Sequence, residues 1–187
     1  MAVVHHTTLE PGKLELLTAW LPTREWFTGT TPHLHKAGGF RLDDPDGEVG
    51  IEHMLVVDTA DARRPVYHVP MTYRGAPLPG ADAALIGTSE HGVLGTRWIY
   101  DAAHDPVALA QMAALLSGRA VAQDQNLSDT PDRTVEVSAV AAATPKTVRV
   151  NRIPPRSAAS AHGWVRVGWT DAEGTAAEGV VLEAAVN

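Results

Sequence analysis

The stretch GFRLDDPDGEVGIEHMLVV, residues 39–57, contains the pattern that decides the fold. Apolar residues alternate with polar ones up to the motif DPDG, and the alternation resumes at Val49. Proline presets the first torsion of a turn and glycine accepts the left-handed one. The stretch therefore predicts a β-hairpin in which residues 38–43 pair with residues 48–58.

Two helices are expected beside this hairpin. Leucines at helical spacing, preceded by Pro11 in the first turn and ended by Pro22, predict a helix over residues 11–21. Asp105 as the N-cap, a proline at the first helical position and Gly118 after the last turn predict a second helix over residues 105–117.

The residues between and after these elements predict further strands and loops. Residues 23–37 lack sustained periodicity and predict an irregular connection, pinned by Trp26-Phe27. Alternation over residues 67–73 predicts a third strand, and Pro70 favours an edge or bulge position for it. After a polar loop at 123–133, four alternating or apolar runs predict an antiparallel meander, at residues 134–142, 146–153, 163–170 and 179–186.

These elements predict an α+β fold in a single domain spanning residues 1–187. We expect a curved antiparallel sheet of about seven or eight meander-like strands, with about two helices packed on one face of it. The pattern leaves open whether the last four strands complete this sheet or form a second layer. It also leaves the oligomeric state open.

Composition excludes several classes of partner. The net charge of −7 comes without a clustered basic face, which argues against nucleic acid or an anionic membrane as the main partner. The absence of cysteine excludes disulfides and thiolate metal sites. No apolar run approaches the ~20 residues of a membrane span, and the first residues lack the apolar core of a signal peptide. We therefore expect a cytoplasmic protein that does not cross a membrane.

No motif predicts a catalytic residue, a cofactor or a metal site. The acidic residues 43–48 fit a hairpin turn better than a calcium loop, and the histidines lack helical metal-ligand spacing. The loop Ser89-Glu90-His91 lacks the final glycine of a nucleophile elbow, which ranks an enzyme last among the possible functions. Neither a phosphate-binding glycine loop nor a kinase catalytic loop is present in the sequence.

Three blocks together resemble the N-terminal cap of the actinobacterial maltokinases: GFRLDDPDGEVGIE (39–52), VPMTYRGAPL (69–78) and LIGTSEHGVLGTRWIYDAAHDPV (85–107). The opening LEPGKLELLTAWLPTREWF (9–27) is similar to the first helix of that cap. The resemblance implies a mostly β, cystatin-like unit without a settled catalytic role. Because the sequence ends at Asn187, before any kinase lobe, it also implies a stand-alone cap-like protein.

The resemblance further implies a link to maltose, trehalose or glycogen metabolism. The first hypothesis is a non-catalytic accessory protein whose partner is a sugar kinase or a glucan-processing enzyme. The second is a protein that binds a small ligand, a sugar or a sugar phosphate.

Polar and aromatic residues within the matching blocks are the candidate ligand- or partner-binding residues. Aromatic rings stack on carbohydrate C–H faces while charged groups bind hydroxyls, but the same residues could instead pair across strands and fill the core. Trp164 and Trp169 lie on opposite faces of one predicted strand, so one of them could anchor a partner. The candidates are Arg41, Glu52, Thr72, Tyr73, Arg74, Glu90, His91, Arg97, Trp98 and Asp101.

Overall fold

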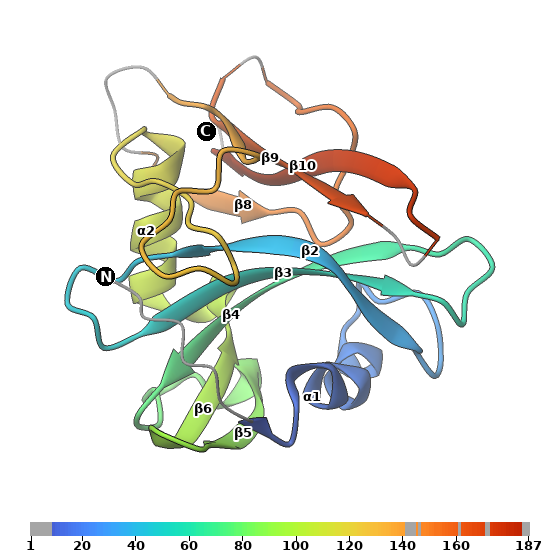
Figure 1. The fold of residues 1–187 in the computed structure, drawn as a ribbon, viewed down its shortest axis with the longest axis vertical. Helices are drawn as coiled ribbons and strands as arrows, with labels where there is room; N and C mark the ends of the chain where they lie inside the picture. Colours follow the sequence, from blue (N-terminus) through green and yellow to red (C-terminus); the bar gives the residue numbers. More distant parts are fainter. Residues whose placement is uncertain (1–8, 141–144, 146, 161, 171–172, 185–187) are drawn as a thin grey trace.

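Two antiparallel sheets and two α-helices form the protein, as the computed structural model in Figure 1 shows. The structure describes residues 9–140, 145, 147–160, 162–170 and 173–184. The helices are α1 (Lys13–Trp20) and α2 (Pro106–Leu116), with 3-10 turns η1 (Leu21–Thr23), η2 (Asp82–Ala84) and η3 (Ala102–His104). The strands are β1 (Leu9–Glu10), β2 (Leu34–Leu42), β3 (Gly50–Asp58), β4 (Val66–Arg74), β5 (Leu85–His91), β6 (Gly95–Asp101), β7 (Glu136–Ser138), β8 (Val148–Val150), β9 (Trp164–Thr170) and β10 (Ala176–Ala184). The predicted α+β class is confirmed.

The first sheet has six strands in the order β1-β5-β6-β4-β3-β2. Its β2–β3 hairpin is the one predicted from residues 39–57, but β2 begins at Leu34, inside the segment predicted to be irregular. A bulge between Lys36 and Gly38 shifts the register of β2 against β3. Such a bulge breaks the period-2 pattern, which explains why alternation in the sequence did not predict the first half of this strand.

Strand β4 is an interior strand between β6 and β3, so the edge position expected from Pro70 is wrong for the sheet as a whole. The pairing of β4 with β6 nevertheless ends at Met71, which faces Asp101. Pro70 pairs only with His53 of β3. The missing N–H of this proline therefore falls where β6 has already ended, and no ladder hydrogen bond is lost there.

The helices contact opposite faces of the six-stranded sheet, which corrects the expectation that both lie on one face. Met54 and Val56 of β3 belong to the apolar cluster that includes Leu17 and Trp20 of α1. Ile51 and Leu55, on the alternate positions of β3, pack with α2 and the second sheet. Because successive side chains of a strand point to opposite faces, β3 contributes to two separate cores.

Strands β7 to β10 form a second, four-stranded sheet in the order β7-β9-β10-β8, so the predicted meander is wrong. β10 pairs with β9 on one side and β8 on the other, which separates two strands that are consecutive in the sequence. Val165, Val167, Val181 and Leu182 turn toward α2 and the first sheet. Parts of the predicted runs, at 141–142, 146 and 185–186, lie outside the described residues.

Both predicted helices are confirmed. One detail differs, because Pro11 lies before the N-cap of α1 and not in its first turn. Pro11 precedes α1, which has Gly12 as its N-cap. The Asp105 side chain accepts the Val107 N–H at the start of α2. After the helix, Gly118 adopts a φ of 70° that favours glycine.

Trp26 and Phe27 pin the connection between α1 and β2. Their ring centroids lie 6.0 Å and 5.3 Å from that of Tyr67, which is fully buried. The expected role of this aromatic pair is confirmed.

Truncating Leu55 should strongly destabilise the protein, because this side chain is 1% exposed at the junction of the first sheet with α2 and the second sheet. We expect Leu55→Ala to lower the free energy of unfolding by about 2–5 kcal/mol in urea titrations. Leu94→Ala removes the same atoms from a side chain that is 44% exposed, and it should change the free energy by less than about 0.5 kcal/mol. Equal effects of the two variants would contradict this packing.

Candidate functional site

Glu52 is a buried candidate carboxylate, 4% exposed, and it lies on the α1 side of β3. Its side chain accepts hydrogen bonds from Lys13 Nζ at 2.6 Å and from the Tyr73 hydroxyl at 2.7 Å. Gln125 Nε2 donates to the other carboxylate oxygen at 3.1 Å. These three donors come from α1, β4 and the loop after α2, so Glu52 joins segments that are far apart in the sequence.

Gln125 reaches Glu52 because Gly39 has no side chain. A Cβ built on Gly39 would lie 2.6 Å from Gln125 Nε2 and 2.0 Å from the carbonyl oxygen of His53. The φ of Gly39 is 139°, a conformation that residues with a side chain rarely adopt. The glycine is therefore required here both by its torsion and by the close approach of the loop.

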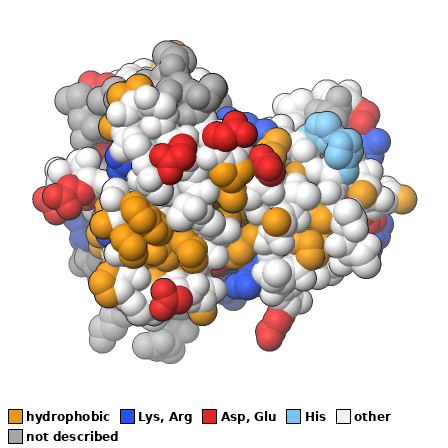
Figure 2. Space-filling view, turned by 90° about the horizontal axis from the view of Figure 1, so that it is seen from below, with side chains coloured by type: hydrophobic (Ala, Val, Ile, Leu, Met, Phe, Trp, Pro, Cys, Tyr) orange, Lys and Arg blue, Asp and Glu red, His pale blue; other side chains and the backbone are white. Residues whose placement is uncertain are grey.

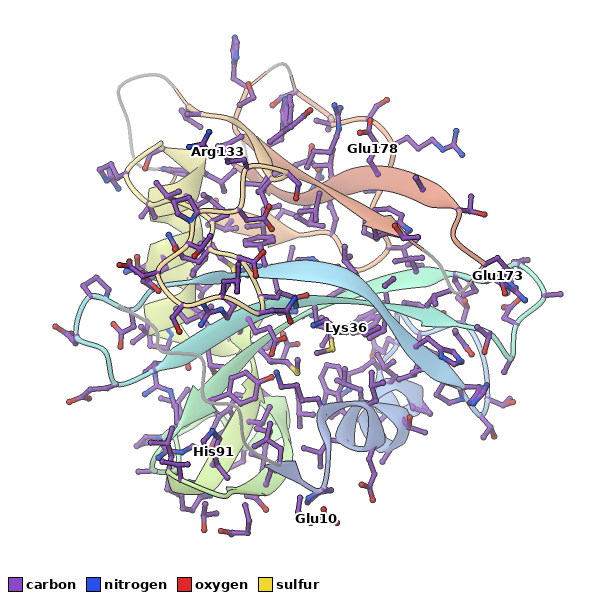
Figure 3. The ribbon with its side chains drawn as sticks, viewed as in Figure 1. Glu10, Lys36, His91, Arg133, Glu173 and Glu178 are labelled. Atoms are coloured by element: carbon purple, nitrogen blue, oxygen red, sulfur yellow. The ribbon has the colours of Figure 1, made fainter. Side chains whose placement is uncertain are left out.

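The surroundings of Glu52 keep it ionised. Burial alone would raise the pKa of Glu52, but the Lys13 ammonium and the hydrogen bonds from Lys13 and Tyr73 lower it below its ordinary value. Burial and the adjacent carboxylate raise the pKa of Tyr73 well above its ordinary value. Lys36 of β2 lies on the side of the sheet that faces α1 (Figure 3), where burial lowers the pKa of its ammonium and Glu52 opposes that shift.

A second polar pair is buried on the opposite side of β3. His53 Nδ1 lies 3.0 Å from His68 Nε2, and neither residue is exposed to solvent. The His53 ring stacks on Phe40 with centroids 4.3 Å apart. Burial lowers the pKa of His53 to about 3, and burial also lowers that of His68. Both rings are therefore neutral at pH 7 and act as part of the core.

His68 also connects the two sheets. Its Nδ1 lies 3.2 Å from the carbonyl oxygen of Asn151, and its backbone N–H donates to the Arg152 carbonyl. This histidine pair could not be predicted from the sequence, because its two members come from different strands and the β3–β4 register brings them together.

Several of the predicted residues form ion pairs that fasten the ends of strands. Arg74 binds both oxygens of Asp105 at 2.7 Å, which ties β4 to the start of α2. Burial would raise the pKa of Asp105, but the hydrogen bond from Arg74 is among the contacts that lower it. Asp101 accepts a hydrogen bond from Arg152 at 2.5 Å, and the Arg152 guanidinium lies 5.0 Å from the centre of the Trp26 ring.

The residues at the tip of the β5–β6 hairpin hold its turn. His91 Nδ1 accepts the backbone N–H groups of Val93 and Leu94, and Arg97 donates to the carbonyl of Leu94. Glu90 accepts a hydrogen bond from Thr96 at 2.6 Å. Glu90 and His91 therefore hold this region by hydrogen bonds.

Ser89, Glu90 and His91 lie in strand β5, not in a loop as expected. Ser89 is buried, and its hydroxyl donates to the carbonyl of Pro11 at 2.8 Å. The structure therefore uses this serine to fasten the segment before α1 to β5.

The ten candidates do not converge on one cleft. Glu52 and Tyr73 meet on the α1 side of the sheet, whereas Arg74 reaches α2 and His91 lies at the hairpin end (Figure 3). Thr72 is buried in β4, and Trp98 of β6 is half-buried opposite Arg74. Arg41 holds the loop after α2 through the carbonyls of Asp124 and Leu127. A ligand- or partner-binding role for these residues stays a prediction.

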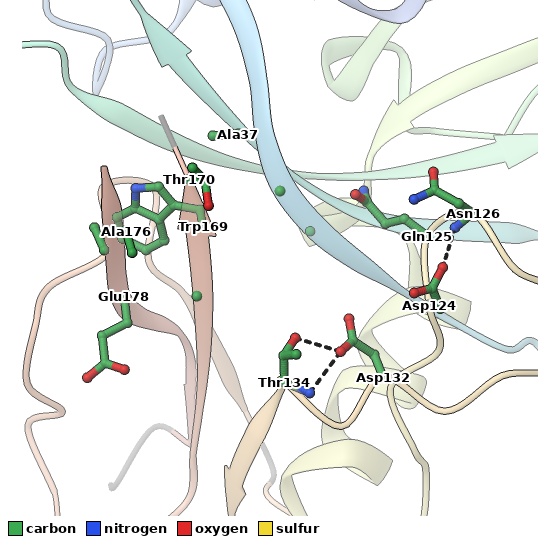
Figure 4. Close-up of a pocket in the computed structure, with 14 residues that line it drawn as sticks. Ala37, Asp124, Gln125, Asn126, Asp132, Thr134, Trp169, Thr170, Ala176 and Glu178 are labelled. Carbon is green, nitrogen blue, oxygen red and sulfur yellow. Dashed lines mark hydrogen bonds between the residues drawn. The ribbon is translucent and has the colours of Figure 1, made fainter. Parts of the chain in front are cut away.

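An open groove of about 600 Å³ lies beside this network, at the junction of the two sheets. Figure 4 shows Asp124, Asp132 and Thr134 on one side of it and Thr170, Ala176 and Glu178 on the other, with β2 behind them. Gln125 lines the groove and contacts Glu52, so the groove and the buried carboxylate share one side chain. The paired glycines at 38–39 were the only sequence signal for this close approach.

The acidic residues 43–48 form the turn that the sequence predicts. Asp44 accepts the backbone N–H groups of Asp46, Glu48 and Val49 through its side chain. Across the described ranges, no group of three or more histidines and carboxylates is placed to hold a metal ion. No helix in that same part of the chain is long and apolar enough to cross a membrane.

Strands β2 to β6 of the six-stranded sheet fall within a known family unit. Residues 20–105 match the maltokinase N-terminal cap domain. The match runs from Trp20, the last residue of α1, to Asp105, the N-cap of α2. The resemblance to the maltokinase cap is thereby confirmed for this segment, and Lys13, Gln125 and the second sheet lie outside it.

Replacing Glu52 by glutamine should destabilise the protein in a pH-dependent way. The folded-state pKa of Glu52 is lowered, so its contribution is present above the unfolded pKa of about 4.3 and is lost as the pH falls through the folded value. At pH 7 we expect Glu52→Gln to lower the free energy of unfolding by about 1–3 kcal/mol. Urea titrations should show this deficit shrink below about pH 4. Glu48→Gln, in the exposed turn, should cost less than about 0.5 kcal/mol at pH 7.

Removing His53 should weaken the response to mild acid. Its pKa is about 3 when folded and about 6.5 when unfolded, so the unfolded chain binds the extra proton between these values. Stability therefore falls as the pH drops through this window, by up to about 1.4 kcal/mol per pH unit for this residue. We expect His53→Gln to reduce the slope of the unfolding free energy against pH between pH 6.5 and 4. Leu55→Ala serves as a control that loses stability but keeps the wild-type slope, and an unchanged slope in His53→Gln would contradict the assignment.

Proposed function

We propose that this protein is a non-catalytic cap module that acts as an accessory partner of a sugar kinase or a glucan-processing enzyme. The observation that carries the proposal is the match of residues 20–105 to the maltokinase N-terminal cap domain. A module of this family is linked by its name to an enzyme that phosphorylates maltose. The proposed setting is therefore the metabolism of maltose, trehalose or glycogen.

The contacts of the polar side chains support binding over chemistry. The matched segment uses its charged groups to hold the fold: Glu52 binds Lys13, Arg74 binds Asp105, and His91 caps its own turn. A catalytic acid or base must instead approach a substrate within hydrogen-bond reach. Groups that are already buried or doubly bonded within the protein do not meet that requirement.

The surface on the α1 side supports a protein partner. Val93 and Leu94 are 65% and 44% exposed, and their turn is held by His91 and Arg97. Figure 2, which views the molecule from below, shows hydrophobic side chains gathered on part of this face with acidic side chains around them. An ordered turn that exposes apolar side chains loses little entropy when it docks.

The test is complex formation with a defined enzyme. The purified chain should bind the catalytic lobes of a maltokinase that lacks its own cap, and analytical size exclusion with light scattering should show a one-to-one complex. Replacement of both Val93 and Leu94 by serine should weaken this complex by about tenfold or more, as expected for removal of an exposed apolar anchor. The double variant should keep the wild-type melting temperature.

Two outcomes would contradict the proposal. One is the absence of a complex with maltokinase lobes and with glycogen- or trehalose-processing enzymes at protein concentrations of about 100 µM, where even weak specific interfaces are populated. The other is phosphorylation of maltose from ATP by the chain alone, measured by chromatography of the sugar products.

A further inference from the structure

The groove between the sheets exists because one strand stops early. β7 pairs with β9 only from Glu136 to Ser138, opposite residues 166 to 164. If the pairing continued, Thr134 would face Gly168 and Asp132 would face Thr170. These four residues instead line opposite sides of the groove (Figure 4). Among the described residues, the last part of β9 therefore has a strand partner on its β10 side only.

The back of the groove is also a strand edge. β2 is the outermost strand of the first sheet, and its outer side is bridged within the described chain only where Arg41 pairs with Gln123. Ala37, Gly38 and Gly39 lie at the back, so two unpaired edges border the same space. Unpaired strand edges offer rows of N–H and C=O groups to another extended chain.

The lining leaves room for a backbone. A Cβ built on Gly168 would meet only the Ala177 carbonyl among the described residues, at 3.8 Å, so the space beside this part of β9 is open, whereas Gly38 packs against Trp169 and Gly39 against Gln125. The free part of β9, residues 167–170, is about four residues long, which corresponds to roughly 13 Å of extended chain. Addition of a strand to an open edge is a common mode of peptide recognition, in which main-chain hydrogen bonds give affinity and side-chain pockets give specificity.

The charge of the lining indicates which side chains the peptide should carry. Asp124, Asp132 and Glu178 line the groove, and no lysine or arginine of the described part of the chain does. Asp124 and Asp132 each use Oδ1 to accept local hydrogen bonds, which leaves Oδ2 without a hydrogen bond from the described residues. Such a rim favours basic side chains and opposes phosphorylated ligands.

We propose that this groove binds an extended, basic peptide segment of a partner protein, which adds to the free edge of β9 beside β7. The inference rests on the proposed accessory function and names the kind of segment that the partner contributes. The segment lies with its backbone along residues 167–170 and its lysine or arginine side chains toward Asp124 and Asp132. It meets the protein at the sheet junction, apart from the Val93–Leu94 turn.

The test uses a defined probe, the acetylated and amidated hexapeptide Lys-Val-Lys-Val-Lys-Val. Nitrogen-15 NMR titration should shift the amide signals of Gly38, Gly39, Gly168 and Thr170. Fluorescence polarisation should show binding at least about tenfold weaker for the Glu-Val counterpart and for a copy methylated at alternate backbone nitrogens.

Two variants and one control localise the effect. Gly168→Val should weaken binding about tenfold, because among the described residues a Cβ there meets only the Ala177 carbonyl, at 3.8 Å, so that the fold should tolerate a side chain that narrows the groove. Asp132→Asn keeps the Oδ1 acceptor and should weaken binding about threefold through lost charge. Asp46→Asn removes an exposed charge that does not line the groove, and it should leave binding unchanged.

Several results would overturn the inference. These are no binding of the peptide, equal binding of the methylated copy, or signal shifts confined to residues outside the groove. Shifts of the groove amides by maltose or glucosamine without shifts by the peptide would assign the groove to a saccharide instead. If Gly168→Val leaves binding to the maltokinase lobes intact, this inference fails and the proposed function stands. If only the Val93 and Leu94 variant loses that complex, the proposed function likewise stands.

Discussion

Burial of strand β3 on both faces is the constraint on which the rest of the structure depends. Every residue of β3 from Ile51 to Asp58 is buried, although the strand contains the ionisable residues Glu52, His53 and Asp58. A buried charge or ring nitrogen must find a partner inside the protein, since water cannot reach it. Lys13, Tyr73 and Gln125 donate hydrogen bonds to Glu52 on one side of the strand, and His68 pairs with His53 on the other. The positions of α1, of the loop after α2 and of the connection to the second sheet all follow from contacts with this strand.

Sequence patterns predicted the local elements well because those elements depend on neighbouring residues. The β2–β3 turn, α2 with its Asp105 cap and the aromatic pair after α1 are each specified within a few positions. The order of the second sheet was not predictable in the same way, because β10 separates β8 from β9 through pairing between distant segments. Glu52 and Tyr73 were among the predicted candidates, whereas Lys13, Gln125 and the His53–His68 pair were not. Their roles depend on register and on a bulge at Lys36–Gly38, which alternation alone does not reveal.

The polar residues of the matched segment serve the fold. Arg74 and Asp105 join β4 to α2 by a two-pronged ion pair, and the same aspartate caps that helix. Replacing either member would leave the other without its main partner in a largely dry site, which is costly. Mixed arginines, carboxylates and aromatics on adjacent strands are therefore not by themselves a sign of a sugar site. In this protein, the features available for binding are the unpaired strand edges and the acidic rim of the groove, whereas the paired residues belong to the interior.

The boundary of the family match has a consequence for where this protein can be cut. The match begins at Trp20 and ends at Asp105, yet the lysine that neutralises Glu52 precedes it and the glutamine that shares that carboxylate follows it. The apolar face formed by Phe40, Ile51 and Leu55 is covered by α2 and the second sheet, which the match also leaves out. A fragment trimmed to the recognisable segment would expose that face to water and strand a carboxylate in the interior. The unit that sequence similarity recognises is thus smaller than the unit that folds.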